Sequence, residues 1–258
     1  MIFTKISLYT YHDMKIAILS DIHSNLEALQ ACCRKSKSLG VEQYVCLGDI
    51  IGYAADPVAT LEIVMSLPGI IAVRGNHDEA VLSGSYPING SKIQQAISWT
   101  HLQLLPNHLA FIKSLPYTRS FNNAVFAHAS VYQPKKWEYL YCPEQIKKCL
   151  QAAEYPVVFL GHTHVPVLYY ETSLGVIKEK QPEESSAIPL YHQRRYVVNV
   201  GSVGQPRDGN NAASFVVLDT SADEVTFYRV SYDYTSTARK IIAAGLAPRF
   251  AERLAEND

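Results

Sequence analysis

Five short apolar segments of this chain are each followed by side chains that can bind metal ions or carry protons. The segments span residues 16–20, 44–47, 70–73, 124–127 and 157–160. The polar side chains that follow them are Asp21, His23, Asp49, Asn76, His77, His128, His162 and His164. Imidazole nitrogens combined with carboxylate and amide oxygens suit Mn, Fe, Zn, Co or Ni better than Mg or Ca. The pattern therefore predicts a metal site assembled from five separate parts of the chain.

The number of candidate ligands favours two ions over one. Without His77 there are seven of them, whereas a single ion takes about four to six ligands. Asp21-x-His23 and His162-x-His164 each place one residue between two ligands. Because residues two apart lie on the same face of extended backbone, we expect each pair to bind one ion together. A carboxylate would then bridge the two ions. The alternative, that these residues only cap strands and turns, is weakened by the recurrence of the pattern.

The segments before these ligands have the length and the β-branched or aromatic content of buried strands. Between them, residues 26–39 have apolar residues at helical spacing and end at Gly40. Pro57 begins a second helix that runs to about residue 67. The resulting order of strand, helix, strand, helix, strand predicts a parallel sheet. Ligands gather at the carboxyl ends of the strands in such sheets, which is where the candidate ligands lie.

The second half of the chain is predicted to be richer in strands. Strands are expected at 117–121, 124–128, 165–170, 195–200, 212–218 and 225–232, and helices at 91–115 (with a break at Pro106), 143–153 and 235–255. Asn122-Asn123 is typical of a two-residue hairpin turn. Residues 178–194 are polar and are expected to form an exposed hairpin tip or a mobile loop.

Length and composition indicate one globular domain. Hydrophobic residues make up 48% of the 258 residues and charged residues 18%, with a formal net charge of −1. This balance predicts binding neither to a nucleic-acid polymer nor to a membrane surface, and no apolar segment reaches the length of about 18 residues that a membrane span needs. Five cysteines without a CxxC pair indicate reduced thiols and a cytoplasmic protein. We interpret residues 1–13 as an N-terminal extension, Met14 as a candidate natural start, and 14–258 as a single domain with a helical C-terminal tail.

The motifs resemble the five blocks of the calcineurin-like metallophosphoesterase superfamily, in that family's order. The blocks are Asp21-x-His23, Gly48-Asp49, Gly75-Asn76-His77-Asp78, His128 and Gly161-His162-x-His164. Residues 48–53 and 199–207 further resemble a branch of small bacterial and archaeal phosphoesterases, and the resemblance covers residues 14 to about 254. It implies an α/β fold with a two-sheet β-sandwich core flanked by helices, in which a βαβαβ first half precedes a β-rich second half.

The resemblance also implies a role for each block. One divalent ion would be held by Asp21, His23, Asp49 and His164, and the second by Asp49, Asn76, His128 and His162. Asp49 would bridge the two ions, for which Mn is favoured among Mn, Fe, Zn, Co and Ni. A hydroxide held between the ions would attack phosphorus, and His77 would protonate the leaving group as general acid.

Other residues are open to two interpretations. Arg207 has the planar fork that binds a phosphate bidentately, but it can equally be a turn arginine paired with Asp208. Tyr53 either lines the pocket or packs beneath its loop. The aromatic loop 129–142 either stacks on a nucleobase or forms local core.

We therefore expect a dinuclear metal-dependent phosphoesterase that hydrolyses a small phosphodiester or phosphomonoester, with nucleotides among the candidates. Gly52-Tyr53 stands where serine/threonine protein phosphatases carry Asp-Arg, which argues against that activity, while Ala54-Ala55 replaces the Gly-Pro usual in the small branch. One alternative is a dinucleoside polyphosphate hydrolase, for which Arg207 and loop 129–142 would hold the extra phosphates and a base. Another is a non-catalytic scaffold, which the complete ligand set disfavours.

Overall fold

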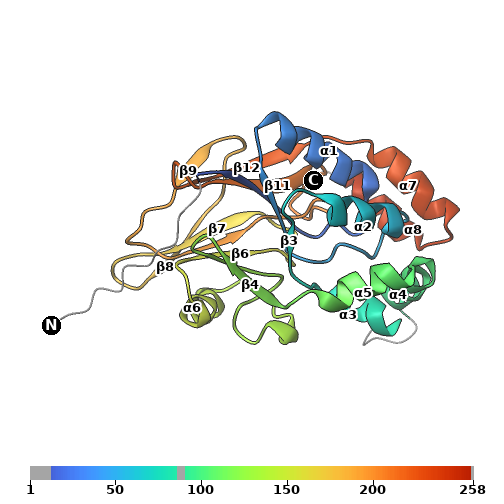
Figure 1. Ribbon diagram of the computed structural model, residues 1–258, viewed down its shortest axis with the longest axis horizontal. Helices are drawn as coiled ribbons and strands as arrows, with labels where there is room; N and C mark the ends of the chain where they lie inside the picture. The colour runs from blue at the N-terminus through green and yellow to red at the C-terminus, as the bar shows by residue number, and fades with distance from the viewer. Residues whose placement is uncertain (1–12, 86–90, 257–258) are drawn as a thin grey trace.

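Two β-sheets pack face to face, with helices on the outer side of each (Figure 1). The computed structural model describes residues 13–85 and 91–256. The first sheet has the order β3 (Ile71–Ala72), β2 (Gln43–Cys46), β1 (Lys15–Leu19), β11 (Ala213–Asp219), β12 (Glu224–Val230) and β9 (Ala187–Pro189). The second has the order β4 (Thr118–Phe121), β5 (Ala124–Ala127), β6 (Val157–Leu160), β10 (Tyr196–Asn199), β7 (Val167–Glu171) and β8 (Ile177–Lys180). This arrangement confirms the predicted fold class.

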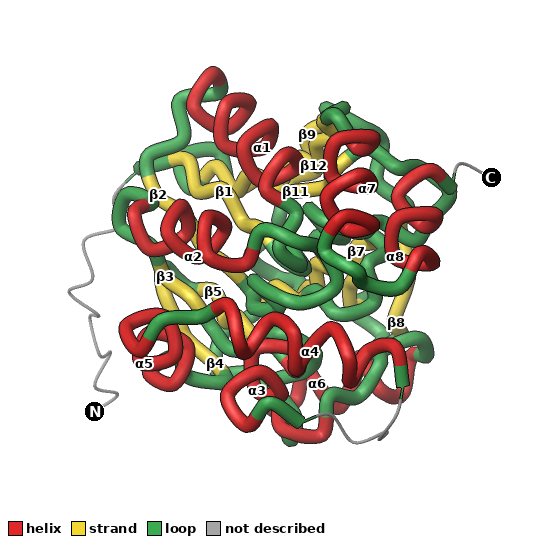
Figure 2. Tube along the Cα trace, turned by 90° about the vertical axis from the view of Figure 1, so that its right-hand side faces the viewer, coloured by secondary structure: helices red, strands yellow, loops and turns green. Residues whose placement is uncertain are grey.

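Helices cover the outer faces and frame one end of the sheets. The helix α1 (Leu26–Ser38) packs on the first sheet between α2 (Pro57–Ser66) and α7 (Tyr234–Ala243), and α8 (Pro248–Glu252) packs on α7. The second sheet is covered by α6 (Pro143–Ala152). The remaining α-helices are α3 (Asn76–Ser83), α4 (Lys92–Gln103) and α5 (Pro106–Ser114), and single 3-10 turns lie at Pro134–Lys136 and Arg253–Ala255. Figure 2 shows loops filling the space between α1, α2, α7 and α8 above and α3 and α4 below.

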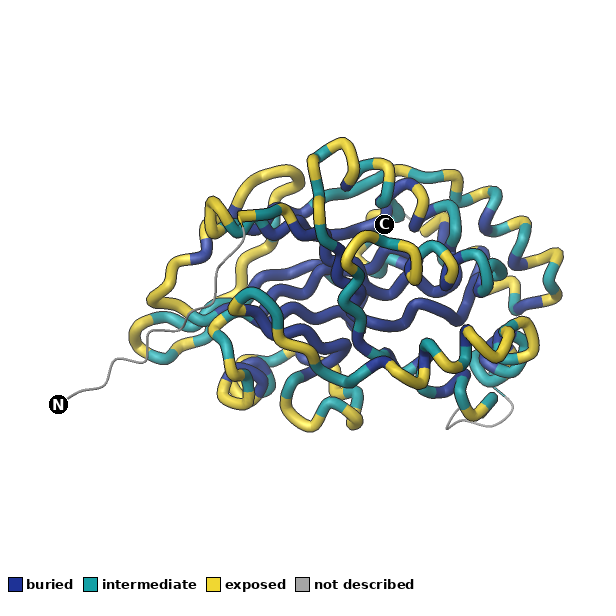
Figure 3. Tube along the Cα trace, viewed as in Figure 1, coloured by how far each residue is buried: buried dark blue, intermediate teal, exposed yellow. Residues whose placement is uncertain are grey.

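Alternation along the strands divides the apolar side chains between separate cores. In β1, Ile16 and Ile18 point between the sheets, where they meet Phe159 of β6. Ala17 and Leu19 point the other way, into the layer beneath α1 and α2. Burial of such a side chain contributes about 1.5–3 kcal/mol, and the inner strands β1, β2, β5, β6, β10 and β11 are buried along most of their length (Figure 3). The stacked layers therefore fix where each strand ends.

The carboxyl ends of the parallel strands meet at one edge of the molecule. Strands β1, β2 and β3 run parallel in the first sheet, as do β5, β6 and β10 in the second. His128, which follows β5, lies with its Nδ1 atom 2.9 Å from the carbonyl oxygen of Leu47, which follows β2. The two sheets thus bring the loops after their parallel strands into contact.

Several local predictions hold and two need correction. Asn122 and Asn123 have φ angles of 50° and 61°, as the predicted two-residue turn between β4 and β5 requires. The sequence predicted no helix between residues 73 and 91, but Asn76 and His77 form the first turn of α3. The loop predicted for residues 178–194 is also wrong in part, because its ends pair as β8 and β9. Backbone pairing with β7 and β12 outweighs the polar composition of that stretch.

Three further points concern the N-terminal extension, membrane-spanning helices and the cysteines. The proposed N-terminal extension lies outside the described residues, apart from Asp13. Among the described helices, none is both long and apolar enough to cross a membrane. The described cysteines carry free thiols, and burial raises the pKa of Cys32 and Cys46 above the usual range for thiols.

Candidate metal centre

The structure brings the seven predicted ligands together at the edge where the parallel strands end. Asp21 and His23 follow β1, Asp49 follows β2, and Asn76 begins α3. His128 follows β5, and His162 and His164 follow β6. The carboxylates and imidazoles among them are buried, with relative exposures of 5% or less. Two overlapping groups of these side chains have ligand atoms close enough to hold an ion, and a third group combines His23 and Asp49 with His77.

One half of the centre is formed by Asp21, His23 and His164. The His164 Nε2 atom lies 3.1 Å from Asp21 Oδ1 and 3.2 Å from His23 Nε2. The His23 Nε2 atom also lies 3.7 Å from Oδ2 of Asp49. These are the residues that the sequence assigned to the first ion.

The other half is built around His128. Its Nε2 atom lies 3.0 Å from Asn76 Oδ1, 3.2 Å from His162 Nδ1 and 3.5 Å from Asp49 Oδ2. Asp49 Oδ2 therefore lies between the two halves, where a bridging ligand would have to be. Asp21 Oδ1 lies 3.9 Å from the same His128 atom, so this second carboxylate also faces both halves.

Backbone carbonyls orient the imidazole rings so that lone pairs point inward. The Nδ1 atom of His164 lies 2.6 Å from the carbonyl oxygen of Gln205, and that of His23 lies 3.3 Å from the carbonyl oxygen of Ile51. A carbonyl oxygen only accepts, so these Nδ1 atoms carry the protons and each Nε2 atom carries a lone pair. The two lone pairs and the Asp21 Oδ1 atom then face one another at 3.1–3.7 Å, an arrangement that a cation stabilises. The donor set fits a metal ion.

Each carboxylate is held through one oxygen while the other faces the centre. Asp21 Oδ2 accepts hydrogen bonds from the Ser20 hydroxyl (2.7 Å) and the His162 backbone N–H (2.8 Å). Asp49 Oδ1 accepts one from the His77 backbone N–H (2.8 Å). Oδ1 of Asp21 and Oδ2 of Asp49 are thereby left to face the imidazoles. Ser20 was not identified from the sequence, where it is one more residue of an apolar segment.

The charges of the centre are balanced among its own groups. Burial alone would raise the pKa of Asp21 and of Asp49. His164 and His128 instead hold the pKa of Asp21 below its usual range, and His128 does the same for Asp49. Burial opposes protonation of His128, yet the two carboxylates raise its pKa to about 9. Burial lowers the pKa of His162 to about 3, with His128 adding to the shift. A proton on His128 thus supplies charge that a divalent cation would supply instead.

The backbone at the ligands is left-handed, which corrects one expectation. The φ angles of Asp21, His23, Asp49, His162 and His164 are 52°, 52°, 48°, 67° and 63°. The prediction that the two Asp/His-x-His pairs lie in extended backbone is therefore wrong. His162 and His164 also reach different halves of the centre, so that pair is not positioned as expected for binding one ion together. Non-glycine residues in this conformation carry strain, and such residues cluster at functional sites.

His77 and Asp78 adjoin the centre in different ways. The His77 ring lies 4.8 Å from the His23 ring, and its position in the first turn of α3 brings it within reach of His23 and Asp49. Burial lowers the pKa of His77. Asp78 turns away, and its carboxylate accepts hydrogen bonds from the backbone N–H groups of Gly75 and Ile50, both at 3.0 Å. Asp78 therefore fixes the two loops against each other.

Two neighbouring hollows open at the centre. The first, of about 220 Å³, is lined by Asp49, Tyr53, Asn76, His77, Ile93, Tyr139, His162, His164, Arg207 and Arg253. The second, of about 580 Å³, shares Asn76, Tyr139 and His162 with it and adds Trp137 and Leu82. Arg207 and Tyr53 thus line the pocket, while Asp208 pairs with Arg229.

Arg253, which lies in the predicted helical tail, is a pocket residue that the sequence did not single out. Tyr139 belongs to loop 129–142, for which stacking on a nucleobase was one of two interpretations. The Tyr139 ring stacks on His162 with ring centroids 4.1 Å apart.

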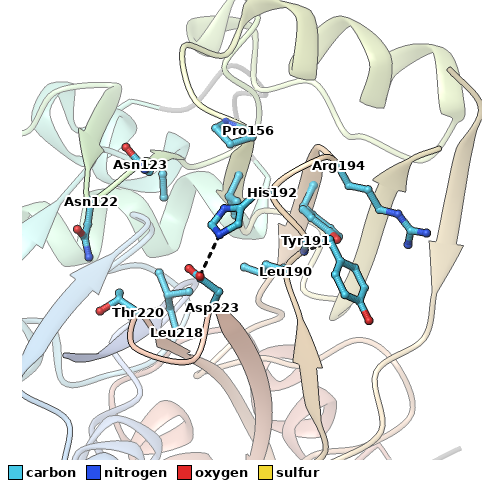
Figure 4. Close-up of a pocket in the computed structure, with 13 residues that line it drawn as sticks. Asn122, Asn123, Pro156, Leu190, Tyr191, His192, Arg194, Leu218, Thr220 and Asp223 are labelled. Carbon is cyan, nitrogen blue, oxygen red and sulfur yellow. Dashed lines mark hydrogen bonds and ion pairs between the residues drawn. The ribbon is translucent and has the colours of Figure 1, made fainter. Parts of the chain in front are cut away.

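A separate cavity of about 310 Å³ lies at the opposite edge of the sheets (Figure 4). It is lined by the amino-terminal ends of β5, β6 and β10, at Ala124, Val157 and Tyr196. Its most prominent polar contact is an exposed ion pair between His192 and Asp223, 3.3 Å apart. The described residues that line it include none of the predicted ligands, so it is not part of the metal centre.

Close packing at Gly161 allows a test of how the Asp21 carboxylate is held in place. A Cβ atom there would collide with Ser20 Oγ and Asp21 Oδ2. We expect Gly161→Ala to displace Asp21 and to weaken metal binding about 10- to 100-fold, measured by isothermal titration. Gly175→Ala is the control, because Gly175 has a φ of +73° and open space around it, so that change affects stability alone. Unchanged metal affinity in Gly161→Ala would contradict the role given to the Ser20–Asp21 contact.

Comparisons with known proteins show the family and the fold. The calcineurin-like phosphoesterase superfamily domain matches residues 14–223. An uncharacterized protein of Methanocaldococcus jannaschii is 36% identical over 244 residues, which is 93% of this chain and 96% of that protein. The crystal structure of a metallophosphoesterase from Sphaerobacter thermophilus is similar with a TM-score of 0.84 and 35% identity, over 95% of this chain and 99% of that one. A hypothetical protein from Pyrococcus horikoshii OT3 shares the fold, with a TM-score of 0.74 and 20% identity over 95% of this chain and 98% of its own.

Proposed function

The chain belongs to the calcineurin-like phosphoesterase superfamily, and we propose that it hydrolyses small phosphodiesters or phosphomonoesters at a centre of two divalent metal ions. One observation carries the proposal. Two groups of buried imidazoles face two shared carboxylate oxygens at 3.1–3.9 Å, and the rings are oriented so that lone pairs point inward. An ordinary protein core does not gather so many electron-pair donors without a cation.

The proposed ligands divide between two ions. Asp21, His23, Asp49 and His164 would hold one, and Asp49, Asn76, His128 and His162 the other. Imidazole-rich sets of this kind favour Mn, Fe, Zn, Co or Ni, and Mn is our first choice. When bound, the ions neutralise phosphoryl oxygens and lower the pKa of a water so that it can attack phosphorus.

The remaining side chains of the first hollow complete the proposed site. His77 adjoins His23 and Asp49 on the pocket wall, where its imidazole would protonate the departing oxygen. Arg207 would bind a phosphoryl oxygen, since its guanidinium is held on one side by the Gln205 side chain at 3.0 Å. Tyr53 packs its ring 4.5 Å from both His23 and His77, and so would hold the two imidazoles in place.

A second candidate function has its own observation. The second hollow places Trp137 and Tyr139 beside the metal centre, which suits a substrate with an aromatic base, as in a dinucleoside polyphosphate. Such a compound would be hydrolysed by the same groups. A non-catalytic scaffold remains disfavoured, because no ligand in the set is replaced.

Turnover by metal-loaded protein tests the proposal. Protein stripped with a chelator and reloaded with Mn, Fe, Zn, Co or Ni should hydrolyse p-nitrophenyl phosphate or bis(p-nitrophenyl) phosphate, and the chelated protein should not. We expect the rate to rise with metal content up to two ions per chain. A protein that binds two ions and turns over neither these esters nor dinucleoside polyphosphates would support the scaffold instead.

A further inference from the structure

We propose that Arg253, from the C-terminal tail, acts with Arg207 to bind a second anionic group of the substrate, apart from the phosphoryl group at the metal centre. This inference rests on the proposed function and narrows its substrate class. Both arginines line the first hollow, where Asp49, His77 and His162 also lie. The same two arginines line an adjoining outer hollow together with Pro206, Gly209 and Glu256. Two guanidinium groups therefore share one route into the centre.

The tail is anchored firmly enough to hold an arginine in place. Phe250 and Leu254, on either side of Arg253, are 7% and 4% exposed and belong to one apolar cluster with Tyr53. The Phe250 ring lies 5.1 Å from the Tyr53 ring, which itself contacts the imidazoles of the centre. Earlier in the tail, Lys240 of α7 donates hydrogen bonds to Glu27 (2.5 Å) and Asp56 (2.8 Å). A side chain on this segment is thus fixed relative to the metal centre.

Among the described residues, no carboxylate pairs with the guanidinium group of Arg207 or Arg253. Arg253 is half-buried, and the structure gives its side chain no hydrogen bond or ion pair with any described residue. The Nε atom of Arg207 is buried and donates to no described acceptor. Of the carboxylates that line these hollows, Asp49 faces the imidazoles and Glu256 pairs with Arg249 at 2.6 Å. Two like charges in one cavity repel each other until an anion binds between them.

In this inference, the first and second hollows hold two ends of one substrate. Trp137 and Tyr139 line the second hollow, and Arg207 and Arg253 line the first, which Tyr139 shares. A simple diester of one phosphate would occupy the centre, where Arg207 can reach it, and would leave Arg253 unused. A compound with a further phosphate beyond the scissile one would use both, and planar guanidinium groups bind phosphate bidentately.

A pair of substrates and a pair of variants test this. Thymidine 5′-(p-nitrophenyl phosphate) has one phosphate, whereas diadenosine tetraphosphate has further phosphates beyond the one attacked. We expect Arg253→Ala to lower kcat/KM for the tetraphosphate about 10- to 100-fold, mainly through KM, and to change it less than twofold for the thymidine ester. Arg253→Lys should fall between, because it keeps the charge and loses the fork. Arg239→Ala is the control, since Arg239 lies on the same tail and contacts Ser236 on the surface.

A measurement without metal separates this inference from the proposed function. In EDTA, sodium tripolyphosphate should raise the melting temperature of the wild-type protein and of Arg239→Ala, and raise it less in Arg253→Ala. If no substrate is turned over but this difference is found, the proposed function fails and the anion site stands. Equal losses on both substrates, or no loss on either, together with an unchanged effect of tripolyphosphate, would overturn the inference. Melting temperatures without ligand show whether Arg253→Ala remains folded.

Discussion

Replacing Asp49 with alanine is expected to remove at least one of two metal ions and to lower phosphoesterase activity about 10³-fold or more. The Oδ2 atom of Asp49 lies 3.7 Å from His23 and 3.5 Å from His128, so one carboxylate serves both halves of the centre. Losing metal-based stabilisation of the phosphoryl charge removes several kcal/mol, and each 1.4 kcal/mol is a factor of ten in rate. Mass spectrometry of the desalted protein measures the loss of metal. The rate of bis(p-nitrophenyl) phosphate hydrolysis measures the loss of activity.

Two further variants show whether the effect of Asp49→Ala comes from the loss of a bridging metal ligand. Asp49→Asn keeps an acceptor for the His77 N–H group, which Asp49 Oδ1 now binds at 2.8 Å, but loses the charge. It should lose metal as the alanine variant does, and this outcome would exclude a merely structural effect. Asp21→Ala should keep the ion held by Asn76, His128 and His162. If Asp21→Ala instead loses both ions while Asp49→Ala keeps one, Asp21 is the bridging carboxylate.

Replacing His77 with alanine is expected to lower kcat about 10²- to 10⁴-fold while both ions stay bound. The reason is that a departing alkoxide needs a proton, and His77 is the imidazole of the pocket wall that is not required as a ligand. The loss should be largest for alkyl esters. It should be smallest for p-nitrophenyl esters, whose leaving group needs little protonation. Rates for both ester types, with metal content measured on the same samples, check this.

The contrary outcome for His77 has a clear structural meaning. His23, Asp49 and His77 form one of the groups whose ligand atoms lie close enough to hold an ion. A His77→Ala protein that loses an ion, or that slows both ester types equally, would identify His77 as a ligand or as a support for the loop. His77→Gln, which keeps a polar side chain of similar length, is the matched variant.

The position of the centre was predictable because strand ends are a physical consequence of apolar patterning. Segments such as 16–20 and 157–160 can be recognised as buried strands, and parallel strands bring their carboxyl ends to a shared edge. Asp49, which ends one such segment, therefore had to meet residues from the others. The gathering of the candidate ligands at one edge follows from this logic, whereas the two-sheet core was implied by the resemblance to the superfamily.

Features that depend on packing between distant segments could not be predicted in the same way. The left-handed backbone at His162 and His164 is imposed by contacts with the loop after β1, which periodicity does not report. The helix α3 begins at Asn76, directly after the strand, and carries no separate apolar repeat long enough to recognise. Arg253 enters the pocket only because Phe250 and Leu254 seat the tail against Tyr53. Local sequence around Arg253 gives no hint of that contact.

A crystal structure of the protein loaded with Mn, with anomalous diffraction recorded on both sides of the Mn absorption edge, would test the two-ion centre most directly. Two anomalous peaks about 3.5–4 Å apart are expected, with Asp49 between them and one imidazole group on each side. A single peak, or none among Asp21, His23, Asp49, His128, His162 and His164, would contradict the proposed centre.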